Sequence, residues 1–168
     1  MTGPLSIRRF PDSLLKRPTR EIDRVDESVT KFVDRMILTM RSHPRCVGLA
    51  APQVGSDLRV AVMDASRHPK AKTSRGLIVL INPHIDGAEG ESVQREGCLS
   101  VPDFTANVRR AVRVHVRAFD QFGTPREFWL EDFEAVVAQH EVDHLDGKLF
   151  LDCVANVTTD VFRRKTYL

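Results

Sequence analysis

The sequence predicts an α+β fold. Two segments repeat apolar residues at intervals of three and four, as helices do, and several short apolar runs have the composition of strands. These segments do not alternate regularly, as they would in a parallel α/β fold. At 168 residues and 19.0 kDa the chain has the size of one domain that can bury its own core, so we expect a single unit over residues 1–168.

Composition and charge exclude several classes of protein. Hydrophobic residues make up 42% and charged residues 29% of the chain, which excludes a disordered or collagen-like protein. The formal charge of +2 argues against a dedicated nucleic-acid-binding protein. The longest aliphatic run, Leu77–Ile81, is far shorter than the ~20 apolar residues of a membrane helix, and no secretory signal is visible. Three cysteines cannot all pair with one another, so we expect a reducing, cytoplasmic location.

An amphipathic helix is predicted in the N-terminal part of the chain. Apolar residues recur there at three- and four-residue intervals, which places them on one stripe of a helix, and His43-Pro44 would end it. The residues of this stripe are Ile22, Val25, Val29, Phe32, Val33, Met36, Ile37 and Met40.

Two strands are predicted after this helix. Arg59–Asp64 and Leu77–Asn82 are apolar runs bounded by turn-forming residues, and Pro83 would close the second run. The segment between them, Ser66–Arg75, is polar and basic, which indicates a surface loop.

A hairpin and a second helix are predicted further along the chain. Arg113–Asp120 alternates polar and apolar residues, and Gly123 lies in the turn to the next strand, Arg126–Leu130. From Glu131 the apolar period becomes helical again, and Gly147 is placed to end that helix. The residues on or near one face of this helix are Phe133, Val136, Val137, His140, Glu141 and His144.

The second helix carries a candidate metal-binding motif. His140 and His144 are four residues apart, so their imidazoles lie one above the other and can bind one ion. Glu141 lies next to the first histidine and can reach a water on the ion without binding the ion itself. The alternative is an exposed helix whose histidines merely lie near carboxylates. The apolar stripe that the motif continues favours a metal, because buried imidazoles need partners.

A catalytic site of the zinc type needs a third protein ligand and one open position. No histidine follows His144 and no glutamate follows Glu141, so the third-ligand patterns of the zinc proteases are absent. Asp143 is poorly placed to be a ligand, although it can orient a ligand imidazole. The third ligand must therefore be an aspartate, a cysteine or a residue upstream of the motif.

Cys98 and Cys153 are the two serious candidates for the third ligand. Gly97 precedes Cys98 and lets the backbone approach closely, as a crowded metal site requires. Cys153, in Leu151-Asp152-Cys153-Val154, resembles a packed core residue, as buried free cysteines usually are. The residue pattern favours Cys98 as the third ligand but does not exclude Cys153.

A third segment, Cys46–Gln53, combines small residues with one amide side chain. Small residues let a substrate backbone lie against the chain, and Gln53 can donate a hydrogen bond to a developing oxyanion. The alternative is a tight loop with a solvated Gln53.

Together the three segments resemble the peptide deformylase family, metalloenzymes that remove the formyl group from the N-terminal methionine of nascent chains. The resemblance covers nearly the whole chain and its motifs stand in the family's order. The matching segments are Gly48-Leu49-Ala50-Ala51-Pro52-Gln53, Glu96-Gly97-Cys98-Leu99-Ser100 and Gln139-His140-Glu141-Val142-Asp143-His144. The resemblance implies one catalytic domain over residues 1–168, with mostly antiparallel sheets packed around the helix that carries both histidines.

The resemblance also implies roles for individual residues. Cys98, His140 and His144 would bind the metal. Glu141 would act as the catalytic acid and base, and Gln53 with the Leu99 amide would stabilise the oxyanion. The residues expected to contact the substrate, some of them lining an apolar pocket for its methionine, are Val47, Gly48, Leu49, Gly97, Phe133, Val136 and Val137.

Cofactor and partners follow from the same resemblance. The family generally uses Fe(II) in cells and is often isolated with Zn(II), Ni(II) or Co(II), and thiolate with imidazole suits these ions. The expected partners are formyl-methionyl nascent peptides and, transiently, the ribosome, with no specific nucleic acid and no membrane. A metallopeptidase and a deformylase-like binding domain with little activity are the two alternatives.

Two features depart from the family pattern. Cys46 stands where the family usually has glycine, two residues before Gly48. Many members carry an arginine shortly after the second motif, where it meets the substrate backbone, and Asp103–Asn107 contains none. Arg109 and Arg110 come later in the chain. These departures bear on substrate preference, because none of them changes a metal ligand or Glu141.

Overall fold

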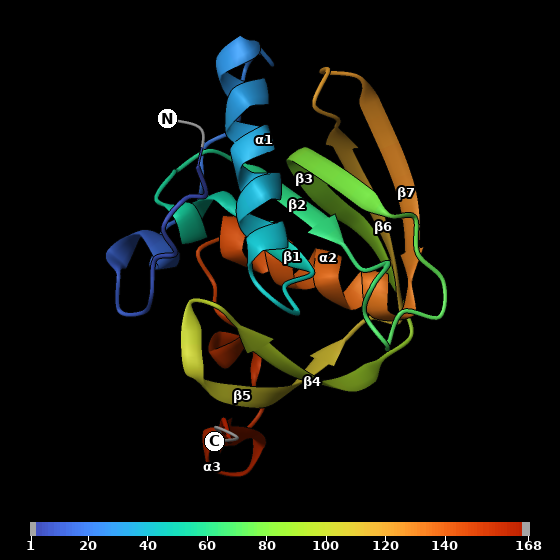
Figure 1. The fold of residues 1–168 in the computed structure, drawn as a ribbon. Helices are drawn as coiled ribbons and strands as arrows, with labels where there is room; N and C mark the ends of the chain where they lie inside the picture. The colour runs from blue at the N-terminus through green and yellow to red at the C-terminus, as the bar shows by residue number, and fades with distance from the viewer. Residues whose placement is uncertain (1–2, 166–168) are drawn as a thin grey trace.

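The computed structural model describes residues 3–165 and confirms an α+β fold (Figure 1). The helices are α1 (Glu27–Ser42), α2 (Asp132–Leu145) and α3 (Val157–Asp160). The strands are β1 (Gly48–Ala50), β2 (Val60–Asp64), β3 (Leu77–Glu89), β4 (Ser92–Cys98), β5 (Val101–Arg110), β6 (Arg113–Phe119), β7 (Pro125–Glu131) and β8 (Val161–Arg163). None of the helices within residues 3–165 is long and apolar enough to cross a membrane.

The strands form two antiparallel sheets, and α2 lies between them (Figure 1). The larger sheet has the order β1-β2-β3-β6-β7, and the smaller sheet has the order β4-β5-β8. One face of α2 packs on the larger sheet through Ala135, Ala138 and Leu145, which are completely buried. That contact turns His140 and His144 toward the smaller sheet, where their side chains meet β4.

Helix α1 is confirmed, but it begins later than the apolar stripe predicts. The Asp26 side chain accepts hydrogen bonds from the backbone N–H groups of Ser28 and Val29, and this cap starts the helix at Glu27. Ile22 and Val25 therefore lie outside the helix, and the prediction that they belong to the helical stripe is wrong. Both still pack against the apolar cluster beneath α1, which explains why they continued the pattern.

Strand β3 continues past Pro83, where the sequence predicted its end. The register of β3 against β6 shifts between Ile81 and His84, and Asn82 adopts a positive φ of 50°. Proline has no backbone N–H to donate, but the hydrogen bonding between β3 and β6 is interrupted at this irregularity, so no N–H group is needed at Pro83. The β6–β7 hairpin was predicted and is confirmed, with Gly123 at φ 78° in its turn.

The smaller sheet was missed by the sequence analysis, and it positions the second motif. In the β4–β5 hairpin Gly97 pairs with Thr105, and the register then shifts so that Cys98 pairs with Val101. Buried positions alternate along β5, and one of them is held by Arg110. The tight end of this hairpin presents Cys98 to α2.

Candidate metal centre

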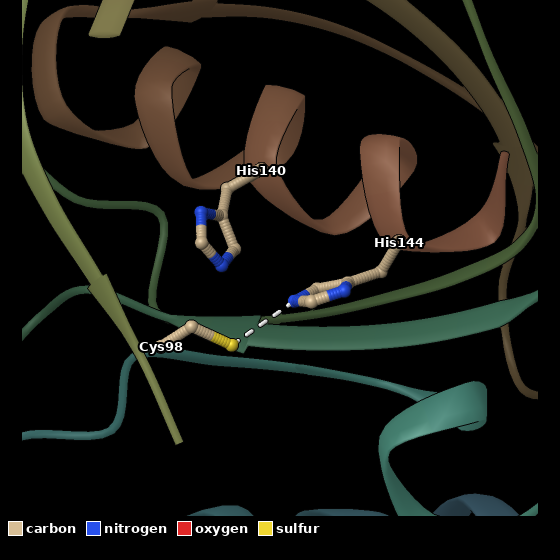
Figure 2. A group of neighbouring side chains, drawn as sticks. All are labelled: Cys98, His140 and His144. Atoms are coloured by element: carbon tan, nitrogen blue, oxygen red, sulfur yellow. Dashed lines mark hydrogen bonds between the residues drawn. The ribbon is translucent and has the colours of Figure 1, made fainter. Parts of the chain in front are cut away.

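Three side chains from distant parts of the chain converge between α2 and β4. One ligand atom from each of Cys98, His140 and His144 lies within 4.8 Å of the others. Figure 2 shows the sulfur and both rings facing one common space, with the Cys98 Sγ 3.2 Å from Nε2 of His144. The predicted pair of histidines and the favoured cysteine thus form one cluster. Cys153 lies outside it, because its thiol contacts Asp143 instead.

The chemistry of these donors fits a divalent metal ion. Burial opposes ionisation of the Cys98 thiol, but the neighbouring His144 and His140 outweigh it and lower its pKa well below the ordinary value. A thiolate and two imidazoles are ligands that suit Fe(II) and Zn(II). Three protein ligands leave a further position open, as catalytic rather than structural sites do. The cluster is therefore a metal site of the catalytic type.

A hydrogen bond outside the cluster orients His140. Its Nδ1 lies 2.8 Å from Oε2 of Glu96, which leaves Nε2 for the ion. The sequence analysis offered Asp143 for such an orienting role, and the structure corrects this. The Asp143 carboxylate accepts a hydrogen bond from Arg110 at 2.6 Å and forms no hydrogen bond with either ligand histidine.

Glu96 and Arg110 form a buried ion pair behind the metal ligands. The Arg110 Nε and Nη2 donate to the two carboxylate oxygens of Glu96 at 2.6 and 3.0 Å. Burial opposes ionisation of Glu96, but the hydrogen bonds from Arg110 and His140 outweigh it and lower the Glu96 pKa to about 2. The carboxylate that orients His140 is thus charged at neutral pH. The sequence analysis gave Glu96 and Arg110 no role.

Glu141 is buried beside the cluster with one oxygen that has no protein partner. Within residues 3–165 its Oε2 accepts no hydrogen bond, although only 3% of the residue is exposed. Burial raises the pKa of the Glu141 carboxyl to about 7. Any side chain at Gly48 would overlap Oε1 of Glu141, so glycine there lets the carboxyl keep its position. A carboxyl so placed can take and return a proton near neutral pH.

Gln53 lies at the same centre, on the short turn Ala51–Val54. Its Oε1 accepts a hydrogen bond from the Ala50 N–H at 2.9 Å, which fixes the amide orientation. Its Nε2 then lies 3.2 Å from the Cys98 Sγ and 3.3 Å from the Ser100 Oγ. Gln53 is buried rather than solvated, and both Gln53 and Leu99 line the cleft described next.

A cleft of about 1010 Å³ opens onto the metal ligands. The predicted substrate-contact residues on its lining are Val47, Gly48, Gly97, Phe133, Val136 and Val137. Leu49 is not among the lining residues, because its side chain is completely buried in the apolar cluster beneath α1. The Phe133 ring stacks on His68 at 4.3 Å between ring centroids, so one wall includes the loop after β2.

Cys46 also lines the cleft and keeps ordinary backbone geometry. The positive φ in this turn belongs to its neighbour Arg45, at 65°. Burial raises the pKa of the Cys46 thiol to about 12, so the group is protonated at neutral pH. It donates to the Gly48 carbonyl at 3.1 Å. The side chain thus occupies cleft space without straining the backbone.

Comparison with known proteins gives consistent matches over most of the chain. The family model described as polypeptide deformylase matches residues 4–160. The peptide deformylase of Syntrophobacter fumaroxidans is 41% identical over 161 residues, covering 96% of this chain and 92% of that protein. The peptide deformylase 1 of Pseudomonas syringae is 43% identical over 162 residues, covering 96% and 93%.

Solved structures agree with these sequence matches. A peptide deformylase from Legionella pneumophila superposes with a TM-score of 0.84 at 39% identity, covering 92% of this chain and 88% of that one. A Met-Ala-Ser-bound class I type b peptide deformylase from Acinetobacter baumannii superposes with a TM-score of 0.85 at 31% identity, covering 92% and 100%.

Proposed function

This chain belongs to the peptide deformylase family and is a metal-dependent hydrolase of formyl-methionyl peptides, and we propose that Glu141, Gln53 and the Leu99 amide carry the reaction beside the metal ligands. The observation that carries this proposal is the convergence of Cys98, His140 and His144 next to the buried Glu141 carboxyl, whose Oε2 has no hydrogen-bond partner within residues 3–165. The products are formate and a free methionine amino terminus.

Glu141 supplies the proton transfers. When bound, the ion makes water a nucleophile at neutral pH and polarises the formyl oxygen. The Glu141 carboxylate takes the proton of the attacking water at its unpartnered Oε2 and later passes it to the departing amine. Its burial excludes bulk water from competing for that proton.

Gln53 and the Leu99 N–H stabilise the negative charge that develops on the formyl oxygen. The contact of Gln53 with the Ala50 N–H keeps its amide N–H groups directed to the centre before substrate arrives. Such preorganised donors lower the barrier because they need no reorientation during the reaction.

Replacing Gln53 with alanine should lower kcat by about 10²–10³-fold, as expected for loss of one oxyanion donor. The variant should retain its metal, because Gln53 contacts the Cys98 sulfur without being one of the three clustered ligands. Formate release and metal content, measured on the same sample, test both parts. Loss of the metal would contradict this role.

We propose Fe(II) as the ion in cells, with Zn(II), Ni(II) or Co(II) as substitutes in isolated protein, because the donor set suits all of them. A ferrous thiolate is open to oxidation, so the activity of iron-loaded protein should decay in air and persist under argon. Zinc-loaded protein is the control and should keep its activity in air. Equal stability of both forms in air would argue against iron.

Formate release from formyl-Met-Ala-Ser by iron-loaded protein under argon tests the function directly. The acetylated peptide is the matched control, and we expect it to remain intact. Cleavage of internal peptide bonds would instead indicate a metallopeptidase. A metal-loaded protein that releases no formate would be the deformylase-like binding domain.

A substrate that emerges during translation places this activity beside ribosomes in the cytoplasm, where contact with the ribosome would be transient.

A further inference from the structure

The mouth of the cleft is far more basic than the chain as a whole. The chain carries a formal charge of +2, yet six basic side chains line the cleft. Its two acidic lining residues, Glu96 and Glu141, are both buried, and Glu96 is already paired with Arg110. The basic lining residues are Arg45, Lys70, Arg95, Arg163, Arg164 and Lys165.

These six side chains are exposed and, within residues 3–165, none forms an ion pair with a carboxylate. Some exposed arginines elsewhere are paired, whereas others within residues 3–165, such as Arg17 and Arg67, have no ion pair either. Arg109 pairs with Glu91 at 2.7 Å, and Arg126 pairs with Asp120 at 2.9 Å. The positive charge at the cleft is therefore available to a ligand.

Arg164 lies against the residue that directly precedes the metal ligand Cys98. β8 pairs with β5, and the Arg164 N–H then donates to the Asp103 carbonyl at 2.8 Å, which anchors the residue beside the cleft. Any side chain at Gly97 would overlap Nη2 of Arg164. The guanidinium thus lies over the backbone of the residue directly before Cys98.

The cations come from both walls of the cleft. Arg95 and Arg164 lie on the side of the smaller sheet, and the Arg95 guanidinium stacks 3.6 Å above the Phe162 ring. On the other side Arg45 precedes β1, and the Lys70 ammonium lies 5.9 Å from the Phe133 ring centroid. Both groups line the same cleft, which opens onto the metal ligands.

We propose that this basic mouth selects formyl-methionyl peptides that carry acidic side chains directly after the methionine, with Arg164 as the main specificity-determining residue. The inference rests on the proposed function, because it assumes that a formyl-methionyl peptide occupies the cleft. An aspartate or glutamate there gains attraction from unpaired cations, and a lysine or arginine is repelled. The cations line a concave cleft that opens onto the metal ligands, which favours a peptide over RNA as the ligand.

The test compares kcat/KM for formate release from formyl-Met-Asp-Ser, formyl-Met-Ala-Ser and formyl-Met-Lys-Ser. We expect kcat/KM to be highest for the Asp peptide, lower for the Ala peptide and lowest for the Lys peptide. The ratio of kcat/KM for the Asp peptide to that for the Lys peptide should be about 3 to 10 at low ionic strength and less than about 2 in 0.5 M salt. Binding of the products Met-Asp-Ser and Met-Ala-Ser to zinc-loaded protein gives a readout that does not depend on turnover, and the acidic product should bind more tightly.

Two variants of Arg164 and one matched control assign the effect. Arg164→Gln should reduce the ratio of kcat/KM for the Asp peptide to kcat/KM for the Ala peptide at least about 2-fold. Arg164→Lys should preserve most of this ratio, because lysine keeps the positive charge that attracts the acidic side chain. Arg109→Gln removes an exposed arginine on the same sheet, outside the cleft, and should leave the ratio unchanged.

Three outcomes would overturn the proposal. Equal kcat/KM for all three peptides with formate still released would reject the specificity and leave the proposed function intact. No formate from any peptide would reject both. Equal rates together with salt-sensitive binding of RNA that Arg164→Gln weakens would reassign the basic mouth to nucleic acid.

Discussion

Glu141→Gln should lower kcat for formate release by about 10²–10⁴-fold, which is the usual contribution of a general acid and base. Glutamine keeps the shape that packs against Gly48 but cannot accept a proton. The three metal ligands are untouched, so the variant should bind metal as the parent does. Steady-state kinetics and metal analysis on one preparation measure both quantities.

A control for this prediction lies on the same helix. Glu134 is also buried, and its carboxylate accepts hydrogen bonds from Ser74 and from the Arg75 backbone, away from the cleft. Glu134→Gln should therefore leave kcat nearly unchanged. A Glu141→Gln variant whose kcat stays within about tenfold of the parent would remove Glu141 from the proton-transfer role.

Arg110→Met should lower the free energy of unfolding by about 3–5 kcal/mol, because it leaves a buried carboxylate without its partner. The side chains of Arg110 and Glu96 are only 6% and 5% exposed, so water cannot replace the lost hydrogen bonds. The same guanidinium also forms an ion pair with Asp143, so the substitution leaves a second carboxylate without its arginine partner. Urea-induced unfolding of zinc-loaded protein, followed by circular dichroism, measures the change.

The neighbouring arginine provides the control for this substitution. Arg109 is exposed on the same strand and pairs with Glu91 at the surface. Arg109→Met should change the free energy of unfolding by less than about 1 kcal/mol, as is usual for exposed ion pairs. If both variants lost equal stability, the Arg110–Glu96 pair would have no special role in holding the fold.

The helices and the β6–β7 hairpin were predictable because their signals are local. Apolar residues three and four apart meet on one helix face, and alternating residues meet on one strand face, whatever the rest of the chain does. The pairing of His140 with His144 is also local, because they are separated by about one helical turn. These features needed no knowledge of distant contacts.

The β4–β5 hairpin was hidden because charged residues occupy its buried positions. Glu96 and Arg110 neutralise each other inside the protein, but each one in the sequence resembles a solvent-facing residue. Ala106 and Val108 on β5 are buried at alternating positions, but two apolar residues are too few to predict a strand when Arg110 holds the next buried position. Buried ion pairs therefore conceal strands from pattern-based prediction.

The sequence alone predicts that two imidazoles share a helix face, that a glutamate lies beside them, and that a third ligand is needed, with Cys98 as the favoured candidate. Only the folded chain shows that Cys98 rather than Cys153 lies beside the two imidazoles and that Glu96 rather than Asp143 orients His140. It also shows that Arg164 lines the cleft. Periodicity encodes contacts within a few residues, whereas these three outcomes depend on contacts between segments far apart in the chain, namely β4 with α2 and β5 with β8. Such contacts are set by the burial of the whole core, which no single segment contains.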